Sequence, residues 1–318
     1  MPSISKNYKP YQKGYLPVSD SHKLYYEFCG NKSGIPVLFL HGGPGSGFVE
    51  SHKRVFDFKK FNVIFFDQRG AGRSRPFASL KANTTAKLIS DINKILDFAG
   101  INRALIFGGS WGSTLALAYA LKHPERVLAL QLRGIFLGDS QSVKYYLNGG
   151  VSVFVPEAYE RFIGNVPVKF RKDIVQYYFS KMKSGNYKER EKACYEWARY
   201  EISLIKLQIT QTEIELYVKD FSYMSLAPLE AHYLRKNCFM PDNYLIKNAH
   251  KLSGIPLSIV HGRYDLICQP RDAYRLHKEI PDSRLKFVFA GHSASEPEIE
   301  KAQKAELKRF AVLLKNKI

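Results

Sequence analysis

Short hydrophobic runs recur along the chain, and most of them end in glycine or in a polar residue. Runs of four to six residues that are rich in valine, isoleucine, leucine and phenylalanine are typical of strands buried on both faces of a sheet. Weak alternation over residues 11–35 also predicts one or two antiparallel strands near the start of the chain. The buried strands are expected at residues 35–40, 62–66, 104–107, 127–132, 255–260 and 284–289.

Helical periodicity separates several of these runs. Residues 84–100 place leucine and isoleucine at helical spacing and end in glycine, residues 114–121 are typical of a buried helix, and residues 297–314 predict a closing helix. Strands that alternate with helices form a mostly parallel sheet with helices on both faces. The sequence therefore predicts an α/β fold.

This alternation stops between residues 139 and 249. The segment is rich in aromatic and charged residues and contains helical stretches such as 193–201 and 228–233. We expect a helical cap inserted after the sixth strand, over the sheet edge where α/β proteins bind ligands. The domain organisation is then a core formed by residues 1–138 and 250–318, with a cap formed by residues 139–249.

Composition narrows the class of protein. With 318 residues and 45% hydrophobic content, the chain is long enough for one large core. Lysine and arginine number 48 against 29 acidic residues, so the net charge is 48 − 29 = +19. Such a charge raises the possibility of a nucleic-acid or membrane partner. The basic residues are spread along the chain, however, and we expect neither partner.

The cysteines and the N-terminus bear on the compartment. The four cysteines lie far apart in the sequence and form no C-x-x-C pair, which favours reduced thiols over a disulfide framework. The first fifteen residues are polar and basic, unlike a signal peptide, and no segment is long and apolar enough to span a bilayer. We expect a soluble cytoplasmic protein, and the sequence leaves its oligomeric state open.

The stretch around Ser110 carries the strongest chemical signal. It reads G-x-S-x-G from Gly108 to Gly112, between a predicted strand and a predicted helix. This is the pattern of a nucleophile elbow, in which a sharp turn exposes the serine and glycines avoid collisions two residues to either side. The alternative, a small residue in a glycine-rich turn, is tested by whether catalytic partners occur elsewhere in the chain.

Two such partners follow later strands. Asp265 comes after the strand predicted at 255–260, and His292 comes after the strand predicted at 284–289. Strands of a parallel sheet end on one edge, so Ser110, Asp265 and His292 are expected to converge there in the order of an α/β-hydrolase triad. His292 would take the serine proton, and Asp265 would orient the imidazole. Asp272 and Asp282 are weaker candidates because neither directly follows a strand.

An oxyanion hole is expected beside the serine. The loop His41–Gly45, with sequence HGGPG, follows a predicted strand and matches neither phosphate-binding glycine pattern. We expect it to supply one backbone N–H, from Gly43, while Trp111, the residue after the nucleophile, supplies the second. His41 itself is interpreted as a residue that hydrogen-bonds the loop.

The remaining sequence features concern the loop that begins at Asp67, the type of reaction, and metal binding. Asp67 and Arg69 are expected to hold this loop by pairing with the backbone and with each other. A serine nucleophile indicates transfer of an acyl group from an ester or amide to water. None of the nine histidines stands in an H-E-x-x-H motif, and we expect neither a metal nor a cofactor.

Taken together, six motifs resemble those of bacterial proline iminopeptidases over nearly the whole chain. The resemblance implies an α/β-hydrolase fold and removal of proline from the N-terminus of peptides. The motifs are HGGPG at 41–45, DQRGAGRS at 67–74, GGSWGS at 108–113, LRGIFLG at 132–138, HGRYD at 261–265 and GHS at 291–293.

The resemblance extends to two glutamates of the cap. The sequence from Trp197 to Glu201 is similar to the family's W-x-x-W-E with Tyr200 in place of the second tryptophan, and Glu230–Tyr233 is similar to its E-N-H-Y with Ala231 in place of asparagine. The resemblance implies that Glu201 and Glu230 bind the positively charged N-terminus of the substrate. The alternative is that both are solvated helix charges, as most glutamates are.

The resemblance also implies a small pocket for the proline ring. Phe136, Tyr146 and Cys268 match the positions that line it. The substitutions at Tyr200 and Ala231 leave open how strictly proline is preferred. The sequence thus favours a serine exopeptidase acting on a free N-terminal proline. The alternatives are a broader aminopeptidase, amidase or esterase on the same triad, and a basic binding protein on an inactive scaffold.

Overall fold

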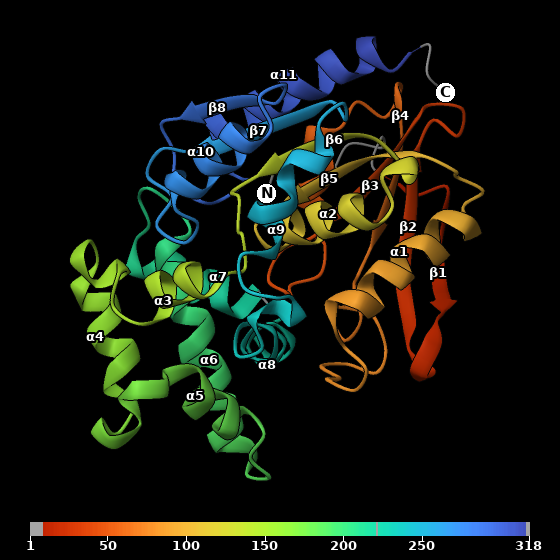
Figure 1. Cartoon of the computed structure of the whole chain (residues 1–318). Helices are drawn as coiled ribbons and strands as arrows, with labels where there is room; N and C mark the ends of the chain where they lie inside the picture. The colour runs from red at the N-terminus through yellow and green to blue at the C-terminus, as the bar shows by residue number, and fades with distance from the viewer. Residues whose placement is uncertain (1–8, 221, 316–318) are drawn as a thin grey trace.

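One mixed sheet runs through the protein (Figure 1). The computed structural model describes residues 9–220 and 222–315, and within them eight strands pair in the order β1-β2-β4-β3-β5-β6-β7-β8. β1 and β2 are antiparallel, as are β2 and β4, and every other neighbouring pair is parallel. The strands are β1 Gln12–Pro17, β2 Lys23–Gly30, β3 Ile35–Leu40, β4 Phe61–Phe66, β5 Ala104–Gly109, β6 Val127–Arg133, β7 Leu257–Gly262 and β8 Arg284–Val288.

The helices fall into a core group and a cap group. In the core, α1 Thr85–Phe98, α2 Trp111–Lys122, α10 Pro270–Glu279 and α11 Pro297–Leu313 flank the sheet. Every regular element described within residues 139–249 is helical, which confirms a helical insertion after the sixth strand. Its α-helices are α3 Ser140–Leu147, α4 Pro156–Gly164, α5 Ile174–Met182, α6 Tyr187–Leu204, α7 Gln211–Asp220, α8 Tyr223–Leu234 and α9 Tyr244–Asn248.

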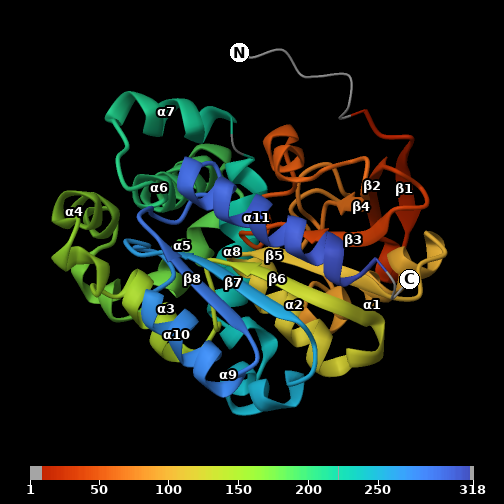
Figure 2. The same ribbon diagram turned by 90° about the horizontal axis from the view of Figure 1, so that it is seen from above.

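Successive residues of the central strands face two different helical layers. On one side, alternate residues of β3, β4 and β5 pack against Leu307 and Phe310 of α11. On the other side, their neighbours pack against α1, α2 and the adjoining helices. Figure 2 shows α11 on one face of the sheet, with α1, α2 and α10 on the other. Because both faces are covered, these strands are hydrophobic throughout instead of alternating.

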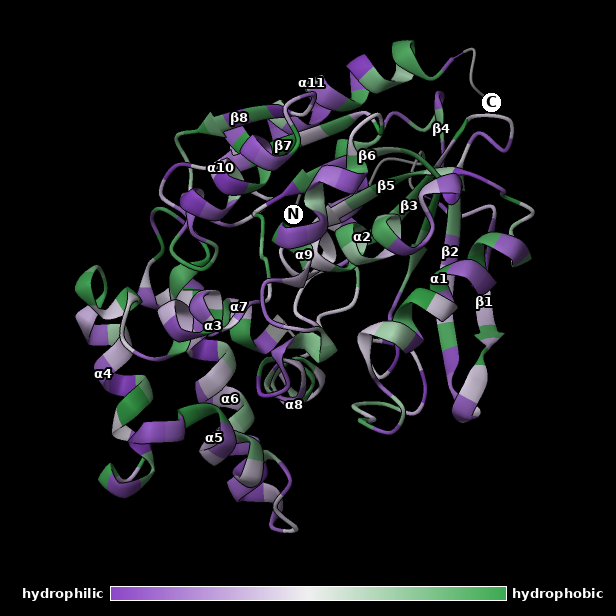
Figure 3. Cartoon of the chain, viewed as in Figure 1, coloured by the Kyte–Doolittle hydropathy of each residue, from purple (hydrophilic) through white to green (hydrophobic). Residues whose placement is uncertain are grey.

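Several element boundaries differ from those predicted. α2 begins at Trp111, directly after Ser110, so the predicted start at residue 114 was too late. α10 lies between β7 and β8, where no helix was predicted. Only one side of this amphipathic helix is buried, through Ala273 and Leu276, so it lacks the continuous hydrophobic run that distinguishes α2. In Figure 3, α2 is largely green while α10 is mostly purple.

The helices α3 to α7 gather in green at the lower left of Figure 1 with α8, in teal, next to them, whereas α9 lies against α2 in the core. Among the described residues, no helix combines the length and hydrophobicity needed to cross a bilayer. Residues 1–8, on which the expectation of a missing signal peptide partly rests, lie outside the described residues.

Candidate active site

Ser110 occupies the sharp turn between β5 and α2. Its backbone has φ 57° and ψ −128°, a conformation that L side chains rarely adopt. A Cβ on Gly108 would lie 2.2 Å from the carbonyl oxygen of Gly112, and a Cβ on Gly112 would lie 2.1 Å from that of Leu40. The close backbone contacts therefore require both glycines, as the motif predicts. The turn leaves Ser110 9% exposed.

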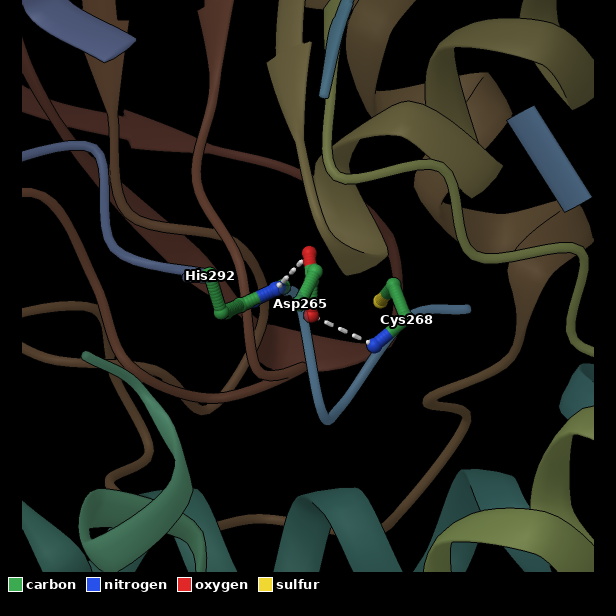
Figure 4. A group of neighbouring side chains, drawn as sticks. All are labelled: Asp265, Cys268 and His292. Carbon is green, nitrogen blue, oxygen red and sulfur yellow. Dashed lines mark hydrogen bonds and ion pairs between the residues drawn. The ribbon is translucent and has the colours of Figure 1, made fainter. Parts of the chain in front are cut away.

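Asp265 and His292 form a buried pair at the same edge of the sheet. Asp265 Oδ2 lies 2.8 Å from Nδ1 of His292, while Oδ1 accepts hydrogen bonds from the backbone N–H groups of Ile267 and Cys268 (Figure 4). Burial alone would raise the pKa of Asp265, but the charge and hydrogen bond of His292 outweigh it and hold that pKa below its usual value. An ionised Asp265 keeps the proton of neutral His292 on Nδ1 and leaves a lone pair on Nε2.

Arg133, at the end of β6, connects the elbow to the histidine. Its carbonyl oxygen accepts the Ser110 N–H at 2.9 Å, and its Nη1 donates to the carbonyl oxygen of His292 at 2.6 Å. Nη1 also lies 3.4 Å from Nε2 of His292. Within the described residues, no hydrogen bond joins Ser110 Oγ to Nε2. Such bonds are often long before substrate binds.

Arg133 was missed as a site residue at the sequence level, although it stands in the LRGIFLG motif. Its position along the chain could have identified it as a site residue. It ends a strand on the same sheet edge that was used to select Asp265 and His292.

Two backbone N–H groups flank the serine. Throughout residues 9–220 and 222–315, neither the N–H of Gly43 nor that of Trp111 donates a hydrogen bond to another protein group. The loop lies against the elbow, since a Cβ on Gly42 would lie 3.4 Å from Cβ of Ser110. Gly43 itself has φ 104°, which favours glycine. The arrangement offers two free donors at the start of α2.

His41 has the structural role expected of it. Its Nε2 accepts the Gln68 N–H at 2.9 Å, and its carbonyl oxygen accepts from the Gln68 side chain at 3.0 Å. Gln68 also accepts the indole N–H of Trp111 at 2.9 Å. Burial lowers the pKa of His41. This neutral histidine therefore ties the glycine loop to the residue that follows Ser110.

The expected pairing of Asp67 with Arg69 is wrong. Asp67 accepts from the backbone and side chain of Arg73, at 2.9 and 2.7 Å, and from the N–H of Phe48 at 2.8 Å. Arg69 instead forms a buried, two-pronged pair with Asp91 of α1, in which Nη2 lies 2.8 Å from Oδ1. The loop is held by backbone contacts as expected, but each charge has a different partner because the chain turns between them.

Two carboxylates of the cap interact with each other: Glu230 is buried, and Glu201 is partly buried. Trp197 and Glu201 are one turn apart on α6, so they share a face of the helix. Trp197 Nε1 donates to Oε2 of Glu230, on α8, at 2.7 Å. One carboxylate oxygen of Glu201, Oε2, is buried without a hydrogen-bond partner among the described residues. The two glutamates are therefore not solvated helix charges.

The environment of this pair favours the protonated acids. Burial raises the pKa of Glu201 to about 7. Burial, together with repulsion from Glu201, raises the pKa of Glu230 well above its ordinary value, against a smaller opposing effect of the Trp197 N–H. A bound cation would reverse this preference, because it stabilises both carboxylates in their charged form.

Asp265, Cys268 and His292 also bring potential metal-ligating atoms within 4.8 Å of one another. However, Asp265 Oδ2 already faces His292 Nδ1, and Oδ1 accepts two backbone N–H groups. Burial raises the pKa of the Cys268 thiol well above its usual value, which disfavours the thiolate that a metal requires. The contacts fit a hydrogen-bonded pair better than a ligand set.

Comparison with known proteins agrees with this geometry. Residues 35–298 match the family model described as alpha/beta hydrolase fold. The chain is 42% identical over 291 residues to the proline iminopeptidase of Xylella fastidiosa (strain 9a5c), an alignment that covers 91% of this chain and 93% of that protein. It is 41% identical over 294 residues to the proline iminopeptidase of Arabidopsis thaliana, with 92% and 77% covered. The chain belongs to the proline iminopeptidase family.

Solved structures extend the likeness to esterases. The esterase EaEST from Exiguobacterium antarcticum matches with a TM-score of 0.67 at 22% identity, covering 95% of this chain and 100% of that one. A thermophilic esterase from Thermogutta terrifontis matches with a TM-score of 0.64 at 19% identity, covering 94% and 99%. At these identities the likeness concerns the fold alone, so membership of the proline iminopeptidase family rests on the sequence relatives.

Tyr200, which departs from the proline iminopeptidase motif, is packed as firmly as a core residue. Its ring stacks on Phe162 with centroids 4.3 Å apart and on Tyr146 with centroids 5.7 Å apart. Its hydroxyl donates to the carbonyl oxygen of Tyr146 at 2.8 Å. Ala231, the second departure, is fully buried on α8. The substituted tyrosine thus supports the position of Tyr146.

Of the three residues expected to line a proline pocket, Tyr146 interacts electrostatically with both glutamates. Burial raises the pKa of the Tyr146 hydroxyl, and the charges of Glu230 and Glu201 and the Cys268 thiol add to this effect. That hydroxyl is buried without a hydrogen-bond partner. Phe136 is also buried, but its described hydrogen bonds are made by its backbone to α2. Tyr146 is therefore influenced both by the cap glutamates and by Cys268, whose backbone N–H donates to Asp265.

Proposed function

We propose that this protein is a serine exopeptidase that releases proline from the N-terminus of peptides through an acyl-enzyme. One observation carries the proposal. The cap holds a buried carboxylate, Glu230, and a partly buried one, Glu201, with an inward oxygen that has no hydrogen-bond partner among the described residues, and the core presents a strained serine and an aspartate–histidine pair. Family membership supports the same conclusion, because the proline iminopeptidases named above are 41% and 42% identical to this chain.

In the proposed mechanism, Ser110 Oγ attacks the carbonyl carbon of the first residue while Nε2 of His292 takes its proton. Asp265 stabilises the resulting imidazolium. The oxygen of the tetrahedral intermediate accepts hydrogen bonds from the N–H groups of Gly43 and Trp111, whose free donors support this assignment. His292 then gives its proton to the departing amine. Nε2 of His292 then takes a proton from water, whose oxygen attacks the acyl carbon. The second tetrahedral intermediate expels Ser110 Oγ, which regains a proton from His292, and the amino acid is released.

Recognition of the substrate is assigned to Glu201 and Glu230. A protonated N-terminal proline carries two N–H groups, and each can donate a charge-assisted hydrogen bond to one carboxylate. The cation also offsets the burial that raises the pKa values of both acids and the repulsion from Glu201 that adds to it at Glu230. The apolar surfaces of Phe136, Tyr146 and Cys268 are assigned to the pyrrolidine ring.

The test is hydrolysis of proline p-nitroanilide beside the alanine and leucine analogues and acetyl-proline p-nitroanilide. We expect kcat/KM for proline to exceed that for alanine by about 10²-fold, since an apolar pocket discriminates ring methylenes to that extent. We expect the acetylated compound to be cleaved at least about 10²-fold more slowly, because it cannot form a charged pair with the glutamates. Equal or faster cleavage of the acetylated compound would contradict the proposal.

A broader aminopeptidase, amidase or esterase on the same triad is the second candidate. It is favoured by the tyrosine at position 200 and the alanine at position 231, where the motif has tryptophan and asparagine. Similar rates on all three free amino-acid anilides would support this alternative while keeping the mechanism.

We also propose that the protein works in the cytoplasm on peptides and binds no nucleic acid. The location is supported by Cys194, Cys238 and Cys268, which are free and buried.

A further inference from the structure

The loop that carries His292 touches the cap backbone to backbone. The N–H of Ser293 donates to the carbonyl oxygen of Ile205 at 2.6 Å. Gly291 packs so closely on the segment after α6 that a Cβ there would lie 2.8 Å from the backbone nitrogen of Leu207. The histidine loop and the segment that follows α6 therefore share one interface.

A single carboxylate bridges the two sides of this interface. Glu296 directly precedes α11, yet its side chain makes no capping bond to that helix. Instead, Oε1 accepts the Gly291 N–H at 2.8 Å, and Oε2 accepts the Leu207 N–H at 3.5 Å. The shorter bond, to Gly291, is partly shielded from water, whereas the longer bond, to Leu207, is exposed. One side chain thus holds the histidine loop and the cap segment together.

The segment that Glu296 contacts follows directly after α6, the helix that carries Glu201. Ile205 is the C-cap of α6, and Glu201 lies in the last turn of the same helix. On the core side, the His292 backbone is held by Nη1 of Arg133. The contacts at Gly291 and Ser293 therefore fix the position of the histidine loop relative to the helix that carries Glu201. Arg133 fixes the position of the same loop relative to the serine elbow.

We infer that Glu296 is a positioning residue: it sets the His292 imidazole by tying the histidine loop to the segment that follows the Glu201 helix. The inference rests on the proposed function, in which His292 is the base. Glu296 acts through backbone N–H groups and takes no part in the chemical step. A displacement of a catalytic group by about 1 Å costs about 10²-fold in rate.

The test compares Glu296→Gln and Glu296→Ala with Glu298→Gln, a matched control at an exposed position in the first turn of α11. Glutamine keeps one acceptor and places an amide donor against the other N–H, so we expect kcat on proline p-nitroanilide to fall about tenfold. With alanine, which keeps neither acceptor, we expect a fall of about 10²-fold. KM should stay within about twofold in both variants, because Glu201 and Glu230 are untouched, and Glu298→Gln should match the unmodified protein.

A second measurement separates this inference from the proposed function. The rate at which a fluorophosphonate labels Ser110 depends on the position of His292 but needs no proline recognition. We expect the same order of labelling rates: unmodified protein, glutamine variant, alanine variant. If the unmodified protein were labelled but left proline anilide intact, the proposed function would fail, and the labelling rates would still test Glu296.

The inference would be overturned if both Glu296 variants matched Glu298→Gln in kcat and labelling rate. A loss confined to KM would also overturn it, because it would place Glu296 in substrate binding. Thermal unfolding of each variant checks the fold. If the alanine variant unfolds, the isosteric glutamine variant carries the test alone.

Discussion

The serine elbow and the glutamate pocket are built in different ways. At the elbow, Ser110 is placed by backbone contacts within a few residues of it, and glycines are required where a Cβ would come within 2.2 Å of a carbonyl oxygen. In the pocket, Glu201 and Glu230 come from separate helices, and the described contact that fixes one of them is the indole N–H of Trp197. Local sterics determine the first region, and packing between helices determines the second.

The two regions also differ in what makes them energetically unfavourable: backbone strain at the elbow, and burial of a carboxylate in the pocket. Ser110 is held at positive φ, a backbone strain of about 1–3 kcal/mol at such sites. Glu201 is held in a buried position that raises its pKa to about 7. In the proposed function, a bound ammonium group would offset the effect of burial on the carboxylates, but it would leave the backbone of the elbow strained. The elbow is therefore a fixed element of the site, whereas the pocket is expected to respond to its ligand.

The largest effect is expected at the elbow. Ser110→Ala removes the nucleophile and should lower kcat on proline p-nitroanilide by about 10⁶-fold, as loss of a nucleophile does in serine hydrolases. The thermal unfolding temperature should change little, because alanine and serine have similar strain at this φ. Activity and unfolding measured on the same preparation check both statements. Turnover within tenfold of the unmodified protein would exclude Ser110 as the nucleophile.

Removal of one pocket charge should have a smaller and more selective effect. Glu201→Gln and Glu230→Gln each leave the shape of the pocket but halve its possible negative charge. We expect kcat/KM on proline p-nitroanilide to fall about 10²- to 10³-fold, the range for breaking a buried charged pair. Hydrolysis of p-nitrophenyl acetate, which has no ammonium group, should stay within about twofold. Glu189→Gln, at an exposed position on α6, is the matched control.

Activity on p-nitrophenyl acetate shows whether the glutamate variants affect only recognition of the ammonium group or also the catalytic triad. Equal losses on both substrates would mean that the glutamates act on the triad and not on the ammonium group. The two regions would then be a single unit, and the division between a fixed elbow and a responsive pocket would be wrong.

The same division explains how much of the site the sequence could predict. The elbow was predictable because G-x-S-x-G describes a purely local turn, and Asp265 and His292 were predictable because parallel strands end on one edge. These arguments need only the strand order along the chain. The central strands were predictable for a different reason: strands that are covered by helices on both faces have continuous hydrophobic sequences.

What could not be predicted depends on side chains that meet across the fold. Arg133 reaches the histidine loop from β6, and Arg69 pairs with Asp91 instead of with its near neighbour Asp67. The sequence offers several candidate carboxylate or carbonyl partners for each arginine. Only the three-dimensional packing determines which of them it binds. The helix α10 was missed because it contains few hydrophobic residues, although those residues lie on one face and this amphipathic pattern could have indicated a helix.

The smallest effect expected concerns stability and tests whether the pocket carries a cost in the free protein. Burial raises the pKa of Glu201 from 4.5 to about 7, so between these two values the unfolded chain binds fewer protons than the native protein and stability falls as the pH rises. Glu201→Gln mimics the protonated acid and escapes this loss. We expect the variant to unfold about 2–5 °C above the unmodified protein at pH 8, with a difference that shrinks toward zero as the pH is lowered to about 4.5. Glu189→Gln should show no such pH-dependent gain. If Glu201→Gln were less stable than the unmodified protein at pH 8, the carboxylate would have a stabilising partner in the free protein, and the pocket would be as fixed an element as the elbow.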